Sequence, residues 1–98
     1  MQVYLKVHTQ GTTEIIAVCD DDLLNKELYE DNFKLKISND FYGGKLIDID
    51  EAINRLSITS NFNIIGNNII RKAIKSGIIL ESSIKKIDNI PMALKMIF

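Results

Sequence analysis

The start of the chain holds two β-strand patterns that only four residues separate. In residues 2–9 (QVYLKVHT), apolar and polar side chains alternate, as in a strand with one buried face. Residues 14–19 (EIIAVC) are almost continuously apolar, which is typical of a strand covered on both faces. Residues 10–13 contain a glycine and supply a tight turn. The two segments therefore predict an antiparallel hairpin in which Thr9 lies opposite Glu14.

The rest of the chain alternates between helix and strand patterns. We predict a short helix from Asp20 to about Leu28, a strand over 33–37, a turn or short strand at 41–44, helices over about 48–59 and 67–76, a short strand or helical turn over 83–87, and a final strand over 92–98. Residues 60–66 are read as a connection. A chain of 98 residues fits one domain, 1–98. The predicted fold is α+β: a mostly antiparallel sheet with two to three helices packed on it.

Aspartates mark the predicted helix starts. Asp48 with Glu51 has the spacing of a capping box, with Asp in place of Ser or Thr. The cluster at residues 20–22 suits the positive end of a helix dipole. These three acids could instead bind a divalent cation, but no further acid follows at the spacing of a calcium loop. A helix start is therefore the favoured interpretation, and we expect no metal site.

The chain is poor in catalytic residues. Its single cysteine, Cys19, can form neither an internal disulfide nor a cysteine zinc cluster. Its single histidine is His8. The predicted hairpin places Cys19 opposite Tyr4, roughly 13 Å along the strand from His8 at about 3.3 Å per residue. That separation is too long for a nucleophile and its base. Cys19 is interpreted as a small core residue, and an enzyme built on it is the least favoured hypothesis.

Charge is unevenly distributed along the chain. The net charge is -1, but residues 1–48 hold five Lys/Arg against nine Asp/Glu, whereas residues 49–98 hold seven against four. Such a polarised distribution suits an anionic partner, although charges that intermix in the fold are the simpler explanation. No leader peptide pattern and no apolar run of membrane-spanning length is recognised, so a cytoplasmic protein is expected.

The stretch FYGGK places two aromatic side chains beside two glycines and a lysine. As a turn, Gly43 and Gly44 would supply unusual backbone conformations while Phe41 or Tyr42 packs into the core. As a binding surface, the aromatic rings would stack on a base or a partner side chain, Gly43 and Gly44 would allow close approach, and Lys45 would reach a phosphate. No Ser or Thr follows the lysine and the upstream glycine is absent, so the stretch is not a P-loop.

Two further groups of cations are candidate binding residues. Lys34 and Lys36 point outward on the predicted strand over 33–37 and would extend the FYGGK surface. The helix over 67–76 presents Arg71, Lys72 and Lys75 on its polar face, with Gly77 as its C-cap. A cationic helix face is most often merely solvated, which is the competing interpretation.

Several segments together resemble a family of proteins of unknown function, DUF424. They are VYLKV, IIAVCD with DDLL, FYGGKL followed by an aspartate, and NIIG ahead of a helix that ends AIKSG. FYGG and AVCD are the most specific of these, and the final PMALKMIF resembles the family only loosely. The resemblance implies an archaeal, cytoplasmic, single-domain protein of about this length. It also implies an association with translation, but no catalytic residues.

Two function classes follow. The first is a non-catalytic binding module for RNA or a ribonucleoprotein particle, which requires no cofactor. The second is a protein–protein adaptor or homo-oligomer built on an exposed strand edge such as the C-terminal MALKMIF. The near-neutral charge weighs against the first class, because most autonomous nucleic-acid binders are more basic. A protein docked mainly on ribosomal proteins would satisfy both.

Overall fold

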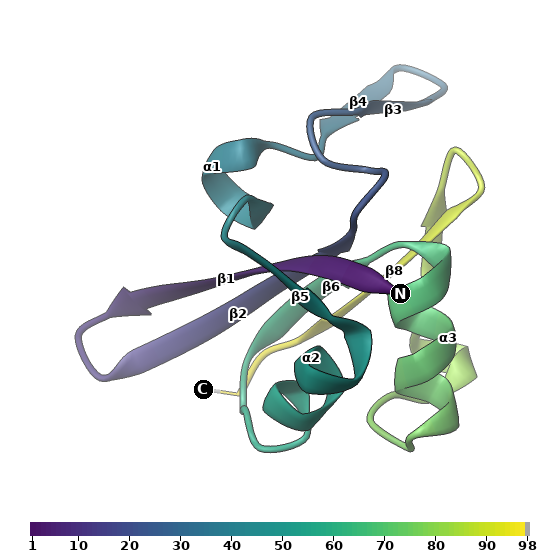
Figure 1. Ribbon diagram of the computed structural model, residues 1–98. Coiled ribbons are helices and arrows are strands. Elements are labelled where there is room, and N and C mark those ends of the chain that lie inside the picture. Colours follow the sequence, from purple (N-terminus) through teal and green to yellow (C-terminus); the bar gives the residue numbers. More distant parts are fainter. Residues whose placement is uncertain (98) are drawn as a thin grey trace.

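The computed structural model describes residues 1–97, and its extents are 35 × 29 × 28 Å. The elements follow one another as β1 (Gln2–Gln10), β2 (Thr13–Asp20), β3 (Glu27–Glu30), β4 (Phe33–Lys36), α1 (Asn39–Tyr42), β5 (Lys45–Asp48), α2 (Ile49–Leu56), β6 (Phe62–Ile65), α3 (Asn67–Lys75), a 3-10 turn η1 (Glu81–Ser83), β7 (Lys85–Ile87) and β8 (Ile90–Lys95). The fold is α+β, as predicted (Figure 1).

Six strands form the main sheet in the order β5–β1–β2–β6–β8–β7. All neighbours are antiparallel except β2 and β6, which are parallel. The hairpin register is confirmed, with Thr9 opposite Glu14 and Tyr4 opposite Cys19. β3 and β4 form a separate two-stranded ribbon that extends away from this sheet (Figure 1).

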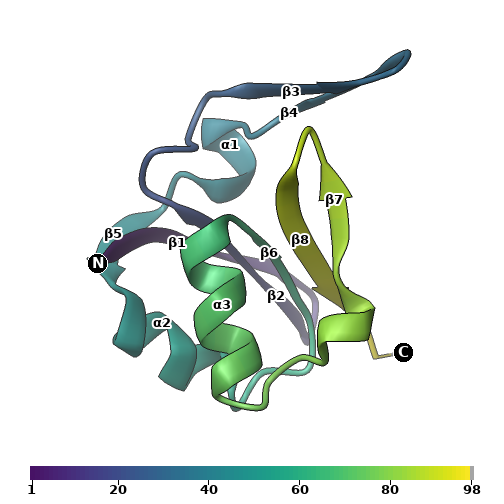
Figure 2. The ribbon, with the colours of Figure 1, turned by 90° about the vertical axis from the view of Figure 1, so that its right-hand side faces the viewer.

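The sheet is covered on both faces. Helices α2 and α3 lie side by side on one face (Figure 2), where the larger core forms. This core contains Val3, Leu5, Ile16, Val18, Ile49, Ala52, Ile53, Leu56, Phe62, Ile64, Ile69, Ile70, Ala73 and Ala93. Part of the other face is covered by the segment from β2 to β5, and the smaller core there contains Ala17, Cys19, Leu23, Leu28, Ile37, Tyr42 and Ile65. The continuous apolar pattern of β2 is explained because both faces of this strand are buried.

Two predicted elements are wrong. Residues 21–25 form turns and not a helix, and the chain then enters β3. Residues 62–65, interpreted as a connection, form the central strand β6. A short apolar run has no period that distinguishes a buried strand from a loop that packs inward. Three smaller differences concern residues 33–45. Phe33, which the alternation over 33–37 predicts to face inward, is 49% exposed. Residues 39–42 form the single turn α1, and the short strand β5 follows the glycines.

Asp20 caps a helix that is distant in sequence, which explains why the helix over 20–28 is absent. Its buried carboxylate accepts hydrogen bonds from the backbone N–H of Asn68 at 2.8 Å and of Ile69 at 2.9 Å. Gly66, which precedes α3, has φ +130°, and a side chain there would overlap the Asp20 carboxylate. The cap thus binds the end of β2 to the start of α3 across 48 residues.

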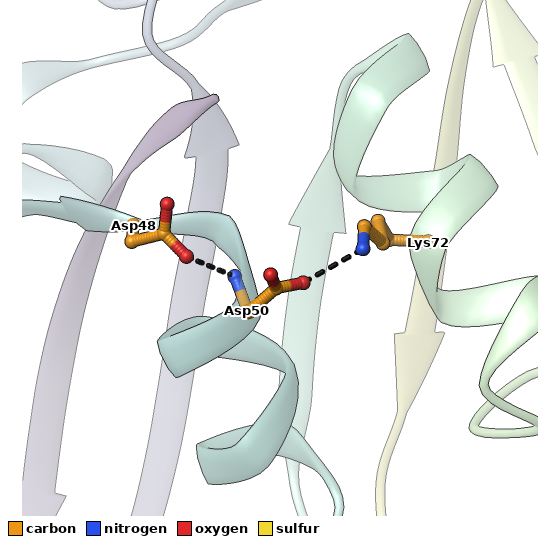
Figure 3. Close-up of polar contacts among 3 residues, drawn as sticks. All are labelled: Asp48, Asp50 and Lys72. Atoms are coloured by element: carbon orange, nitrogen blue, oxygen red, sulfur yellow. Dashed lines mark hydrogen bonds and ion pairs between the residues drawn. The ribbon is translucent and has the colours of Figure 1, made fainter.

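The helix α2 begins as predicted. The Asp48 carboxylate accepts from the backbone N–H of Asp50 at 2.9 Å (Figure 3). The helix ends at Leu56, three residues earlier than predicted, and α3 ends at Lys75 with Gly77 at φ +75° just beyond it. The final strand ends at Lys95, and the predicted end at Phe98 lies outside the described residues.

Candidate functional site

The aromatic rings of the FYGGK stretch are held against the sheet by α1. Tyr42 is only 4% exposed, and its hydroxyl donates to Oδ1 of Asn63 on β6 at 2.7 Å. Burial, and secondarily the neighbouring Cys19, raise the pKa of the Tyr42 phenol to about 12. The ring of Tyr42 is therefore part of the core, and in this conformation a nucleic-acid base has no face of it to stack on.

Phe41 is half-buried and lies on His8. Their rings stack with centroids 4.7 Å apart, and the Phe41 carbonyl lies 2.8 Å from Nε2 of His8. The neighbouring carbonyl of Asp40 accepts from Nζ of Lys6 at 2.6 Å. Both carbonyls at the end of α1 are thus satisfied by side chains of β1, which positions this short helix over the strand.

The two glycines allow the chain to pass close to its own backbone. A side chain at Gly44 would overlap the carbonyl of Leu5 on β1, and one at Gly43 would overlap Asn39. The close approach that these glycines provide is already occupied by the protein's own chain. The burial of Tyr42 in the core matches the interpretation as a turn, but the glycines do not act as predicted there: Gly43 has φ −81°, and Gly44 also lacks a positive φ. Glycine is required at both positions by the close approach of neighbouring atoms and not by the backbone conformation. Lys45, by contrast, is exposed on β5.

Lys34 and Lys36 lie on the β3–β4 ribbon. Both are on β4 of the ribbon, where Nζ of Lys34 is 3.5 Å from Glu27 and Lys36 lies opposite the same glutamate. The hydroxyl of Tyr29 also donates to Glu27, and these two contacts, the hydrogen bond before the cation, lower the pKa of Glu27. These lysines thus lie on a different sheet from Lys45, which is on β5 of the main sheet.

The cations of α3 divide into two sets. Lys72 forms an ion pair with Asp50 on α2 at 2.7 Å, which ties the two helices together and lowers the pKa of Asp50 (Figure 3). Arg71 and Lys75 are exposed and form no ion pair with any residue in 1–97. Lys72 therefore has a structural role, and the other two remain free to contact a ligand.

Arg71 lies on the wall of a groove between α3 and the β7–β8 hairpin. The groove has a volume of about 490 Å³, and Asn67, Ile70, Arg71, Ile74, Glu81, Ile84, Lys86 and Pro91 line it. A second hollow of about 290 Å³ shares Arg71, Ile74 and Glu81 and adds Lys75. We call the two together the α3–β7 groove. Figure 2 shows α3 and the β7–β8 hairpin side by side.

The electrostatics of the α3–β7 groove favour an anion. Arg71, Lys75 and Lys86 line it against one acid, Glu81, and among residues 1–97 none of these four takes part in an ion pair. Two backbone donors at the start of α3, the N–H groups of Asn68 and Ile69, do not contribute, because the Asp20 carboxylate already accepts from them. An anion in this groove would therefore be bound by side chains and not by a helix N-terminus.

Sequence reasoning found Arg71 and Lys75 but missed Lys86, Ile84 and Glu81. Ile84 and Lys86 come from residues 83–87, which were read only as a short strand or helical turn, and Glu81 precedes that segment. The signal that could have identified Lys86 is the positive excess of the second half of the chain. Their position beside α3 depends on the pairing of β7 with β8, which places Lys86 opposite Pro91 on the groove wall.

Cys19 is fully buried, and its burial, reinforced by Asp20, Asp21 and Asp22, raises the pKa of the thiol to about 12. A thiol in this environment is not a nucleophile at neutral pH. Within residues 1–97, no three His, Cys, Asp or Glu side chains are grouped so as to hold a metal ion. In the same range no helix is long and apolar enough to cross a membrane.

Comparisons with known proteins agree with the resemblance seen in the sequence. The model of a family described as a protein of unknown function, DUF424, matches residues 7–97. An uncharacterised conserved protein from Methanopyrus kandleri, known from a crystal structure, is similar with a TM-score of 0.83 and 27% identity. The match covers 96% of this chain and 90% of that one. No match was found among curated proteins.

Proposed function

The chain belongs to the DUF424 family, and we propose that it is a non-catalytic module that binds an RNA backbone in the α3–β7 groove. The observation that carries this proposal is the placement of Arg71, Lys75 and Lys86 along one groove without ion-pair partners in residues 1–97. A cation without an ion-pair partner can neutralise a phosphate. Each such contact releases counterions from the nucleic acid, and this release favours binding.

The shape of the groove also suits a nucleic acid strand. Asn67, Arg71 and Lys75 are spaced by four residues along one side of α3, which spans about 12 Å at 1.5 Å per residue. Isoleucine side chains line the groove between the cations and offer apolar contact to a ribose or a base. Since the cations occupy one groove, the net charge of -1 does not prevent a locally positive surface.

The test is a titration of fluorescein-labelled single-stranded RNA of mixed sequence, about 12 nucleotides long, followed by anisotropy at several salt concentrations. Three phosphate contacts predict a slope of log K against log salt of about −2, at about 0.7 per contact. The double variant Arg71→Glu/Lys86→Glu should abolish this binding. Lys34→Glu/Lys36→Glu makes the same change of charge on the ribbon and should bind like the wild type.

Equal weakening of RNA binding by both double variants would show that only net charge matters, and would refute the α3–β7 groove as the binding site. No measurable binding by the wild type at low salt would refute RNA as the ligand. The two variants are matched for charge, so circular dichroism melts need only establish that both remain folded.

A second candidate function, self-association through β8, is favoured by an unpaired strand edge. β7 pairs with β8 only from Ile90 to Met92, and beyond this point Leu94 is 62% exposed. Exposed apolar edges invite pairing with another strand. Light scattering across a concentration series tests this candidate: a dimer that Leu94→Lys dissociates supports it, and a monomer at the highest concentration refutes it.

A further inference from the structure

The strand β1 has an unpaired outer edge near its end. β2 pairs with β1 as far as Gln10, but β5 pairs with it only from Gln2 to Leu5. Beyond Leu5 the chain of Gly44 lies against β1 and then turns into α1, which packs over one face of β1 and not along its edge. Val7–Gln10 therefore has no strand partner on this side within residues 1–97. Figure 1 shows this end of the β1–β2 hairpin projecting from the molecule.

Unpaired strand edges carry free backbone groups. Along a strand the direction of the N–H and C=O groups alternates, so every second residue of Val7–Gln10 directs its pair away from β2. Such an edge can accept one more strand, in which main-chain hydrogen bonds give affinity and side-chain pockets give specificity. The added strand would lie beside β1 where β5 would continue if it extended beyond Leu5.

A cationic pocket lies beside this open edge. Its volume is about 350 Å³, and it lies between β1, β5 and α2. Leu5, Val7 and Ile47 contribute its apolar lining. Lys6, Lys45 and Arg55 line it with a single acid, Glu51, and of these cations Lys6 already donates to the Asp40 carbonyl. Neither Lys45 nor Arg55 takes part in an ion pair with a residue of 1–97. The pocket is thus complementary to an acidic side chain.

We propose that β1 accepts an extended peptide from a partner protein as an added strand beside Val7–Gln10, with an acidic side chain of that peptide in the pocket of Lys45 and Arg55. This surface is separate from the α3–β7 groove and does not depend on RNA binding. The charge decides between occupants. A second copy of this chain pairing through the same edge would present residues 6–10 (KVHTQ), which contain no acid.

The experiment is a selection from a phage-displayed library of random eight-residue peptides on the full chain. The double variant Lys45→Glu/Arg55→Glu serves as the comparison. Lys26→Glu/Lys85→Glu is the control, because it makes the same change of charge at two exposed positions outside both proposed surfaces. The expected result is enrichment of peptides that combine Asp or Glu with β-branched residues, on the wild type and the control but not on the first variant. No enrichment, or the same enrichment on all three proteins, overturns the proposal.

Two measurements on a selected peptide separate strand addition from simple charge attraction. The peptide is synthesised with its acid changed to the amide, and separately with N-methyl groups on alternate residues, which block main-chain pairing. Each change should weaken binding about tenfold or more, or 1.4 kcal/mol. Unchanged affinity of the N-methylated peptide refutes an added strand. Light scattering that shows a dimer dissociated by Val7→Asp identifies a second copy as the occupant and also refutes the proposal.

Discussion

The FYGGK stretch and the α3–β7 groove both contain residues that the sequence patterns marked as candidate binding residues, but the fold uses them differently. In the first, Tyr42 is buried, Gly44 lies against β1, and the carbonyls of α1 accept from His8 and Lys6. In the second, the cations line a hollow and have no ion-pair partner within residues 1–97. The difference teaches that a motif with the composition of a ligand site is a candidate only where its polar and aromatic groups remain unsatisfied by the protein itself.

The largest expected effect is on the rate at which a thiol reagent labels Cys19. This cysteine lies in the smaller core, which α1 helps to cover. With the thiol pKa raised to about 12, its thiolate fraction at pH 8 is lower by about a thousandfold or more than that of an ordinary cysteine of pKa near 8.5. We expect labelling by a thiol reagent to be slow in the native protein and fast in denaturant. Rapid labelling of the native protein would mean that the FYGGK side of the sheet opens easily.

Truncation of Tyr42 should strongly destabilise the fold. Tyr42→Ala removes a buried ring and should lower the free energy of unfolding by about 3–5 kcal/mol, as for other large aromatic truncations. Tyr42→Phe keeps the ring but leaves Oδ1 of Asn63 without its donor, and should cost about 1–3 kcal/mol. Urea unfolding measures both. If the Tyr42→Ala protein is as stable as the wild type, the ring is not part of the core, and Tyr42 is again a candidate binding residue.

Loss of the Asp20 cap should have an intermediate effect. Asp20→Ala removes the acceptor of two backbone hydrogen bonds at the start of α3 and should cost about 2 kcal/mol. Asp20→Asn retains one acceptor and should cost less. The order Ala worse than Asn, measured by urea unfolding at neutral pH, is the expected outcome, and equal stabilities of the wild type and Asp20→Ala would contradict the cap.

The pH dependence of this cap has a defined sign. Burial raises the pKa of Asp20 above its ordinary value of about 4, and the hydrogen bonds from Asn68 and Ile69 offset only part of that shift. The native state therefore holds this proton to a higher pH than the unfolded state does. As the pH rises from about 4 through the raised pKa, the wild type should lose stability relative to Asp20→Asn. A relative gain over the same window would show that the carboxylate is stabilised as an anion.

The smallest effect on stability is expected in the groove. Arg71→Ala and Lys86→Ala remove exposed side chains that have no ion-pair partner in residues 1–97, and each should change the free energy of unfolding by less than about 0.5 kcal/mol. Thermal melts check this expectation. A loss well above that value would show that these cations support the fold, as the FYGGK residues do.

Local patterns predicted much of the fold. The β1–β2 register followed from alternation and turn length, and the start of α2 followed from Asp48. The wrong predictions share one cause: the residues that determine the local structure are distant in sequence. Asp20 was expected to cap its own segment but caps α3, 48 residues away, and β6 is a strand because β2 and β8 flank it.

The candidate site was predicted less well for the same reason. Composition alone gave no sign that Tyr42 would meet Asn63 on the central strand, or that Lys72 would be paired with Asp50. Lys86 joins Arg71 only because the β7–β8 hairpin folds against α3. The periodicity of α3 did predict that Arg71 and Lys75 face outward, since that depends only on the helix itself.

The most direct measurement is a nuclear magnetic resonance titration of the ¹⁵N-labelled protein with single-stranded RNA. The account predicts that amide shifts concentrate at residues 67–75 and 84–91, around the α3–β7 groove, and that residues 41–45 remain nearly unchanged. Shifts centred on residues 41–45 would contradict it, because they would show that the stretch buried against β1 is the surface that meets RNA.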